Sequence, residues 1–187
     1  KTKAAKKYID KLDGKLSTGL FTGEELEDFS GTARNALEEQ EEIIFRPNPG
    51  KQTAFLAASE KEVLYGGAAG GGKSYAMLVD PLRYVHNKNC KAILLRKSMP
   101  ELQELIDKSQ DLYRKAFPRA KWNQQKSRWS FPSGAFIIMS FVENDTDVHR
   151  YQGQAFTWIG VDELTHYATP YVWNYLRSRL RTTDPTI

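Results

Sequence analysis

Residues 67–74 form a glycine-rich segment that ends in a lysine and a serine. They read GAAGGGKS, which matches the pattern G-x-x-x-x-G-K-[ST] without adjustment. Backbone N–H groups of such a loop surround a triphosphate, and large side chains would block that approach. Lys73 then places its charge at the β- and γ-phosphates, and Ser74 offers a hydroxyl to Mg²⁺. We therefore expect ATP with Mg²⁺ as the ligand, bound also by Gly67, Ala68, Ala69, Gly70, Gly71 and Gly72.

The alternative interpretation of this segment is a flexible glycine turn that carries GKS by chance. The flanking residues favour the phosphate loop, because VLY before it is typical of a strand and YAMLV after it is typical of a helix. A dinucleotide fingerprint, G-x-G-x-x-G, does not fit, since Ala68, Ala69 and Gly70 follow Gly67.

A second chemical signal is a pair of acids at the end of an apolar run. The run FTWIGV predicts a strand that leads into Asp162 and Glu163. In ATPases with a phosphate loop, an Asp at this place helps to hold Mg²⁺. A neighbouring acid can orient the attacking water, so Glu163 is the expected catalytic carboxylate. The alternative is a solvated strand end; with the loop upstream, the acidic pair favours hydrolysis.

The elements that must position these residues alternate between strands and helices. Strands are predicted around residues 61–67, 90–97 and 155–161, and a β-hairpin around residues 121–142 with its turn at Pro132, Ser133 and Gly134. Helices are predicted after the loop, over residues 98–117 and over residues 169–181. This order predicts an α/β fold, a RecA-like P-loop NTPase with a mostly parallel central sheet flanked by helices. Residues 1–45 read as an N-terminal helical segment or lid, and residues 46–187 as the ATPase core.

Proline and polar residues predict where two of the helices end or begin. Pro81 lies inside the helix after the loop and should kink or shorten it. Ser98 and Glu101 have the spacing of a capping box, and Pro100 suits a first helical turn.

The composition is that of an ordinary cytoplasmic domain. The 187 residues are 40% hydrophobic with a net charge of +4, which permits an anionic partner without requiring one. No run approaches the roughly 20 apolar residues of a membrane span, and the first residues are not a signal peptide. The single cysteine, Cys90, precedes a strand-like run and is expected to be a buried, inert thiol.

Taken in order, these motifs resemble the ATPase domain of bacteriophage large terminases, from about Phe45 to Arg181. The resemblance is carried by NPGKQTAFLAAS, GGAAGGGKSYAMLVDPLRY, LLRKSMPELQELI and HRYQGQAFTWIGVDELTHY. It implies ATP hydrolysis in a homo-oligomeric ring that drives double-stranded DNA into a procapsid. The implied partners are the portal protein and the small terminase subunit, in the host cytoplasm and transiently at the portal, without a membrane.

The resemblance also assigns roles to single residues. Gln52 matches a glutamine that contacts adenine; the alternative is an ordinary polar residue at a helix start. Arg150 matches an arginine that reaches the γ-phosphate of a neighbouring subunit; the alternative is a loop arginine paired with Asp145 or Asp147. For Arg96, at a strand end, we expect an ion pair with Glu101 rather than a phosphate contact.

Two basic clusters are candidates for DNA contact, although both also fit a solvated surface. One is Lys121, Lys126 and Arg128 on the first hairpin strand, where Trp122 and Trp129 are expected in the core or at its rim. The other is Arg177, Arg179 and Arg181 on the last predicted helix.

The family continues with a coupling motif and a nuclease domain, which have no counterpart before Ile187, so we expect the chain to be a fragment. Two other functions remain open at this point. One is a helicase-like or other P-loop DNA translocase, and the other is a nucleotide-gated DNA-binding or assembly module. An ABC-type ATPase is poorly supported, because the chain has no LSGGQ-like signature.

Overall fold

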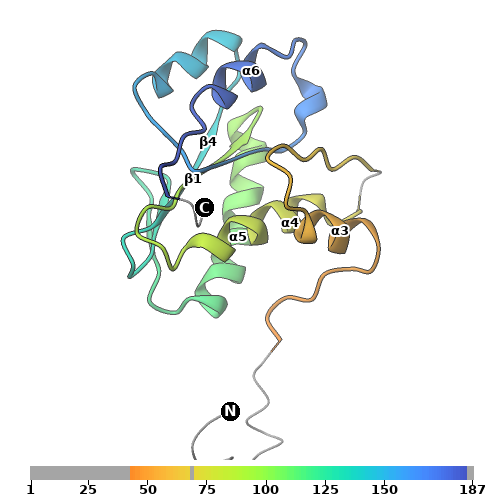
Figure 1. Cartoon of the computed structure of the whole chain (residues 1–187), viewed down its shortest axis with the longest axis vertical. Helices are drawn as coiled ribbons and strands as arrows, with labels where there is room; N and C mark the ends of the chain where they lie inside the picture. The colour runs from red at the N-terminus through yellow and green to blue at the C-terminus, as the bar shows by residue number, and fades with distance from the viewer. Residues whose placement is uncertain (1–42, 68–69, 185–187) are drawn as a thin grey trace, which may run out of the picture. The chain divides into compact units, whose positions relative to one another are not determined.

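The structure is a computed structural model that describes residues 43–67 and 70–184. The predicted N-terminal helical segment lies outside the described residues up to residue 42, and residues 43–48 form neither helix nor strand. The described part is an α/β unit with one five-stranded sheet (Figure 1). None of its helices has the length and apolar character that a membrane span requires.

The sheet combines three parallel strands with an antiparallel extension. Its strand order is β2-β3-β4-β1-β5. The strands are β1 (Lys91–Arg96), β2 (Lys121–Asn123), β3 (Arg128–Ser130), β4 (Phe136–Phe141) and β5 (Trp158–Val161). β1 pairs in parallel with β4 and β5, whereas β3 pairs antiparallel with both β2 and β4. The prediction of a mostly parallel sheet is therefore wrong, and the sheet is mixed.

The predicted hairpin accounts for this difference. The turn at Pro132–Gly134 forms as expected and is closed by a hydrogen bond from Phe131 N to Ala135 O, so β3 and β4 run antiparallel. The expected first hairpin strand is itself folded back by a turn over residues 124–127, where Ser127 has a φ of 42°. It becomes the pair β2 and β3, which adds a second antiparallel ladder.

The strand predicted before the glycine loop does not form. Residues 63–67 lie outside helices and strands, and the side chain of Leu64 is 82% exposed. The apolar run VLY is short and is followed at once by two glycines, which weaken a strand. Within the described residues β5 is consequently the edge of the sheet. The predicted order of strand, loop and helix is therefore not present in the described residues, and the assignment of a RecA-like fold stays a prediction.

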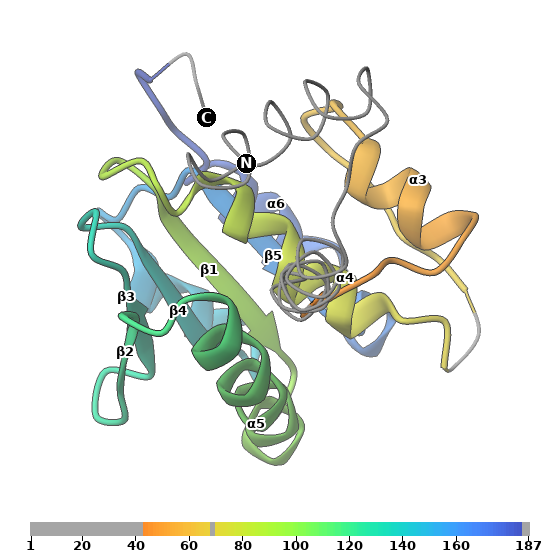
Figure 2. The ribbon, with the colours of Figure 1, turned by 90° about the horizontal axis from the view of Figure 1, so that it is seen from below.

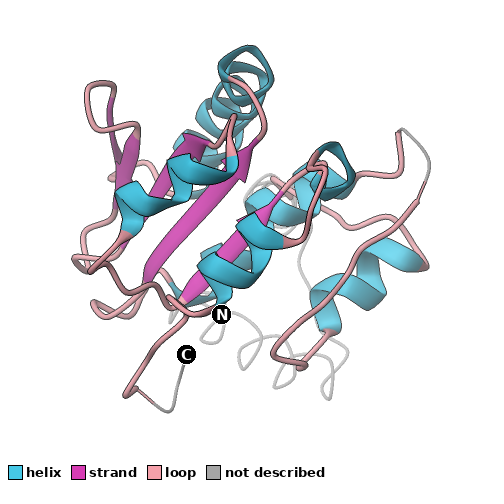
Figure 3. Ribbon diagram, turned by 90° about the horizontal axis from the view of Figure 1, so that it is seen from above, coloured by secondary structure: helices cyan, strands magenta, loops and turns pink. Residues whose placement is uncertain are grey.

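Helices cover both faces of the sheet, as expected. On one face lie α4 (Lys73–Val79), the 3-10 helix η1 (Asp80–Tyr84) and α5 (Met99–Ala116), and on the other lies α6 (Tyr171–Arg177). Figure 2 shows α4 and α5 in front of the sheet and α6 behind it, and Figure 3 shows the strands between cyan helices. The remaining elements are α3 (Lys51–Ala57), η2 (Asp145–Tyr151) and η3 (Leu164–His166).

Strand β1 lies between two hydrophobic clusters. Ala92 and Leu94 pack into the cluster beneath α5, whereas Ile93 and Leu95 pack into the cluster beneath α6. Successive side chains of a strand point to opposite faces, so a continuous apolar run is what a strand covered on both sides requires. Because β1 is fixed on both faces, the position of its last residue, Arg96, is fixed as well.

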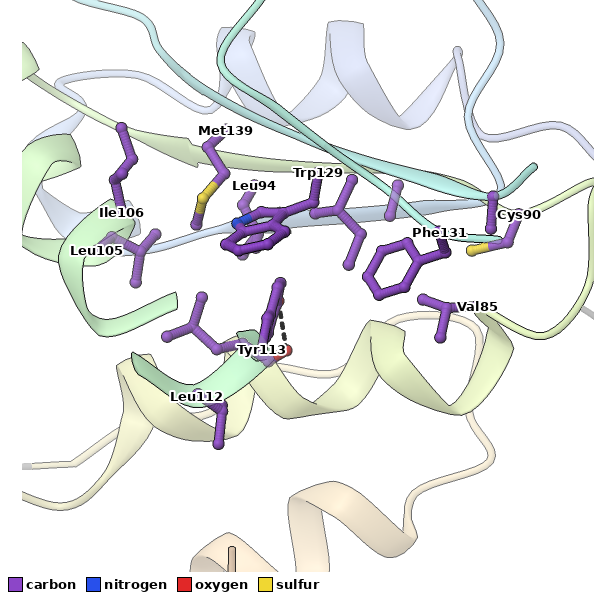
Figure 4. Packing of buried hydrophobic residues seen from close by; sticks show 14 of the residues in the cluster. Val85, Cys90, Leu94, Leu105, Ile106, Leu112, Tyr113, Trp129, Phe131 and Met139 are labelled. Carbon is purple, nitrogen blue, oxygen red and sulfur yellow. Dashed lines mark hydrogen bonds between the residues drawn. The ribbon is translucent and has the colours of Figure 1, made fainter. Parts of the chain in front are cut away.

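The cluster beneath α5 is built around aromatic side chains. Trp129 of β3 meets Tyr113 of α5 edge-on, with ring centroids 5.4 Å apart, among Leu94, Leu105 and Met139 (Figure 4). Trp129 Nε1 donates to Ser109 Oγ at 2.9 Å, which satisfies its buried donor. Trp129 is therefore a core residue, as expected.

Cys90, at the margin of this cluster, is fully buried as predicted. Burial raises the pKa of its thiol, which keeps it protonated and inert.

The helix ends agree only partly with the sequence. α4 ends at Val79 and the 3-10 helix η1 follows, with Pro81 in its first turn, so the predicted shortening is confirmed. The capping box is wrong: the Ser98 side chain makes no cap hydrogen bond, although Pro100 lies in the first turn of α5. α6 ends at Arg177 rather than at residue 181, because residues 179–181 pair with Phe156 beside β5 instead.

Candidate functional site

The phosphate-loop pattern (residues 67–74) and the acidic strand end meet where Ser74 contacts Asp162. Ser74, in the first turn of α4, donates its hydroxyl to Asp162 Oδ2 at 2.9 Å across 88 positions of sequence. Asp162 directly follows β5 and is only 2% exposed. A hydroxyl and a carboxylate oxygen in contact are the kind of hard oxygen ligands that Mg²⁺ takes. The two residues assigned to the metal therefore fit it.

Arg96, at the end of β1, completes this contact from the neighbouring strand. Its Nη2 lies 2.5 Å from Asp162 Oδ2 and 3.1 Å from Ser74 Oγ. The expected ion pair with Glu101 is wrong; the second, longer ion pair of Arg96 is with Glu104 of α5, at 3.7 Å. Parallel strands β1 and β5 end at the same edge of the sheet, which places Arg96 beside Asp162. This pairing was not predicted from the sequence.

Lys73 folds back over its own loop. Its ammonium donates to Gly67 O at 2.9 Å, and the Tyr65 hydroxyl donates to Gly71 O at 2.7 Å. Gly70 and Gly72 both adopt left-handed backbone with φ of 79° and 74°, which glycine accepts without strain. Two predicted loop residues, Ala68 and Ala69, lie outside the described residues.

Gln52 joins helix α3 to the end of the loop. It is 3% exposed, its Nε2 donates to Gly72 O at 2.8 Å, and its Oε1 accepts from Asn48 N at 2.6 Å. The structure thus brings Gln52 to the predicted site, with both ends of its amide bonded to the chain itself. A contact with adenine remains a prediction.

Glu163 turns the chain sharply after Asp162. Its φ of 51° is left-handed, and its N–H donates to Asp162 Oδ1 at 3.1 Å. Its carboxylate lies 4.0 Å from His166 Nε2, and His166 Nδ1 lies 3.6 Å from Glu101. His166 was not singled out from the sequence, although its position three residues after Glu163 could have indicated a neighbour on one helical turn.

A cleft of about 1170 Å³ opens along β5 and is lined by four of the predicted site residues, whereas Ser74, Gln52 and Arg150 do not line it. Gly67, Lys73, Asp162 and Glu163 line it, and so does Leu64 from the unpaired segment before the loop. No group of three or more His, Cys, Asp or Glu side chains in the described part forms a ready-made metal cage. A magnesium ion here would take its remaining ligands from water and phosphate, which is usual for this ion.

Arg150, in η2, makes a different set of contacts among the described residues. Its guanidinium is 3.6 Å from Asp147, its Nε donates to Asp147 O at 3.0 Å, and its side chain is 42% exposed. The alternative of an ion pair with Asp147 is therefore present. Hydrogen bonds from the Asn144 backbone, followed by the charge of Arg150, lower the pKa of Asp147. A contact with a second subunit remains a prediction.

Several side chains of the two basic clusters predicted to contact DNA make contacts within the chain. Arg128 stacks over the Phe136 ring, and Arg177 pairs with Glu62 at 3.1 Å. Arg179, which stacks over Tyr175, and Arg181 both lie beyond the end of α6, so Arg181 does not share a helical face with Arg177 as predicted. Lys121 and Lys126 are exposed on the antiparallel extension.

A comparison with protein families covers most of the residues described above. Residues 64–185, more than half of the chain, match the family model described as terminase large subunit, T4likevirus-type, N-terminal. Comparisons with curated proteins and with solved structures gave no match. The match contains the whole loop pattern (residues 67–74), Arg96, Asp162 and Glu163. The chain therefore belongs to the terminase large subunit family, of the T4-like virus type.

Proposed function

We propose that this chain binds Mg·ATP in the cleft along β5 and hydrolyses it as the motor domain of a phage large terminase. The observation that carries the proposal is the hydrogen bond from Ser74 to Asp162. It joins the last residue of the loop pattern to the first acid after β5, and these are the two residues that the chemistry requires on one metal ion. A glycine turn and a solvated strand end would have no reason to meet.

The loop and Lys73 would bind the phosphates. Lys73 donates to the carbonyl oxygen of Gly67, so its ammonium lies over the loop, within reach of the β- and γ-phosphates of a bound ATP. Bound Mg²⁺ would neutralise charge on those phosphates and orient them. Ser74 and Asp162 would hold it, and Gln52 would fix the end of the loop through Gly72.

Glu163 would orient the attacking water. It lines the cleft beside Asp162, and its left-handed backbone turns it away from the line of the strand. A non-glycine residue in this conformation is strained, and strain of this kind often accompanies function. An ionised carboxylate accepts a hydrogen bond from the attacking water. This hydrogen bond orients the oxygen of the water toward the γ-phosphate.

Membership of the terminase family favours packaging of double-stranded DNA over strand unwinding or nucleotide-gated assembly. By the same resemblance, the portal protein and the small subunit would be partners, and Arg150 would act on the ATP of a neighbouring subunit in a ring. Arg150 is 42% exposed in η2, where it pairs with the half-buried Asp147 and lies over the Phe141 ring, and its exposed part is accessible to such a partner.

Hydrolysis is tested by a single-turnover experiment with radiolabelled ATP and excess protein. We expect Glu163→Gln to bind Mg·ATP like the wild type and to hydrolyse it on the order of 10²-fold more slowly, because the amide cannot accept the proton. Glu143→Gln, an exposed acid beyond β4, is the matched control and should leave the rate unchanged. A Glu163→Gln rate equal to the wild-type rate would remove Glu163 from the mechanism.

A further inference from the structure

Arg96 holds the same two oxygen atoms that the proposed function gives to Mg²⁺. One nitrogen, Nη2, contacts both Asp162 Oδ2 at 2.5 Å and Ser74 Oγ at 3.1 Å. Arg96 is 5% exposed and Asp162 is 2% exposed, so water screens this ion pair weakly. A buried positive charge of the chain itself thus lies on the atoms that the metal would need.

A metal ion cannot share these atoms with the guanidinium. Arginine stays charged at any ordinary pH, and it has no lone pair to offer a metal. Two cations on one buried carboxylate oxygen would repel each other strongly. A divalent ion that takes Asp162 and Ser74 must therefore displace Nη2 from both.

The arginine has another acceptor within reach. Its Nη1 lies 3.7 Å from Glu104 Oε2, on the neighbouring helix α5. Glu104 is ionised, since a hydrogen bond from Lys108 lowers its pKa. Arg96 Nε is buried and has no hydrogen-bond partner among the described residues, so the present position leaves the guanidinium incompletely satisfied. Glu104 Oε2 is therefore an alternative acceptor for Arg96.

We propose that Arg96 is a built-in counter-ion that keeps the metal site closed until nucleotide arrives. Free Mg²⁺ would meet only the Asp162 carboxylate, whose charge Arg96 already neutralises. Mg²⁺ bound to ATP arrives with the negative phosphates, which supply acceptors for both the metal and the displaced arginine. Arg96 is in this sense a positioning residue that makes metal binding depend on nucleotide. The inference rests on the proposed function, because it assumes that Ser74 and Asp162 are the metal ligands.

The test is the affinity of the nucleotide-free 187-residue chain for Mn²⁺, measured from the electron paramagnetic resonance signal of the free ion. The wild type should bind Mn²⁺ weakly. Arg96→Gln removes the competing charge and should bind Mn²⁺ at least about tenfold more tightly. Arg96→Met, which also removes the charge, should change the affinity in the same direction. Asp162→Asn combined with Arg96→Gln should abolish the gain.

Arg114→Gln is the matched control, because this exposed arginine of α5 bonds only to Gln110 among the described residues and its loss changes the net charge by the same amount. Its Mn²⁺ affinity should equal that of the wild type. If Arg96→Gln is folded by circular dichroism and binds Mn²⁺ no more tightly than the wild type, the counter-ion role is wrong.

A loss of stability does not obscure the result. Arg96→Gln leaves Asp162 buried without its partner and should melt at a lower temperature, and Mn²⁺ should raise that temperature more than it does for the wild type. If Mn²⁺ raised the melting temperature of Arg96→Gln and of the wild type equally, the inference would be overturned. Calorimetry of Mg·ATP on the wild type separates the two claims: absent binding contradicts the proposed function, whereas normal binding with unchanged Mn²⁺ affinity in Arg96→Gln contradicts only the role of Arg96.

Discussion

At the scale of single residues, Gly72 shows why the end of the loop must lack a side chain. Its φ is 74°, and a Cβ built on it would lie 2.6 Å from Gln52 Nε2. The amide of Gln52 cannot simply move away, because it is bonded at both ends. Gly72 is therefore required by backbone conformation and by the close approach of α3 together.

Gly72→Ala should destabilise the nucleotide-free chain by more than the cost of a left-handed alanine alone, which is about 1 kcal/mol. Gly134→Ala is the control, since Gly134 has a φ of 98° but its added Cβ would meet only Lys88 Cβ at 3.8 Å. Urea denaturation should give a clearly larger loss in the free energy of unfolding for Gly72→Ala than for Gly134→Ala. Equal losses would show that the contact with Gln52 contributes nothing.

The sequence predicted the chemical groups of the site better than their pairing. Spacing alone selected Ser74 and Asp162, which lie in contact, because the loop pattern and the acidic strand end each require particular residues at fixed positions. The partner of Arg96 could not be predicted in this way. Glu101 is closer in sequence, but the choice of Asp162 depends on which strands are neighbours in the sheet.

At the scale of elements, Tyr113 ties α5 to the helix that follows the loop. Its hydroxyl donates to Leu78 O at 2.7 Å, near the last turn of α4, where backbone carbonyls lack helical partners. The ring is fully buried beside Trp129 (Figure 4). Burial raises the pKa of its phenol well above the usual value. The residue stabilises the fold only in its neutral form.

Tyr113→Phe should lower the free energy of unfolding by about 1–2 kcal/mol at pH 7, because Leu78 O loses its partner. The raised pKa also makes wild-type stability fall above about pH 10, where the unfolded chain loses the proton and the folded chain keeps it. In Tyr113→Phe this fall should be shallower, with Tyr151 and Tyr167, whose pKa values are also raised by burial, accounting for the rest. Denaturation series from pH 8 to 11 would measure both effects, and parallel curves would contradict them.

Elements with their own apolar pattern were predicted well. The runs that became β1, α5 and β4 carry enough buried residues to determine their structure locally. Residues 61–66 have only a three-residue apolar run before the glycines, and they do not pair with β5. The antiparallel direction of β2 and β3 follows from a turn at residues 124–127 that has no glycine or proline to indicate it.

At the scale of the whole molecule, the proposed motor depends on contacts between copies of the chain. Arg150 is the residue that tests this, because its proposed action is on a neighbouring subunit. If it acts in trans, turnover per subunit should rise with protein concentration in the wild type. Arg150→Ala should bind Mg·ATP normally and lose that rise, by on the order of 10³-fold at full assembly. Arg119→Ala, another exposed arginine, should keep the rise.

Mixing two defective subunits distinguishes action in trans from a local role. Arg150→Ala supplies an intact ATP site, and Lys73→Ala supplies an intact arginine. A trans arrangement predicts that the mixture hydrolyses ATP although neither variant does so alone. Recovery of no activity in a mixture that associates would assign Arg150 to its ion pair with Asp147 instead.

The measurement that tests the central claim most directly is calorimetric titration of Mg·ATP into the 187-residue chain and into Lys73→Ala. Lys73 lines the cleft and lies over the loop, so its charge should contribute directly to phosphate binding. We predict one binding site in the wild type and a loss of affinity of more than about tenfold in Lys73→Ala. Absent binding in the wild type, or equal affinity in Lys73→Ala, would contradict the assignment of residues 67–74 as a phosphate-binding loop.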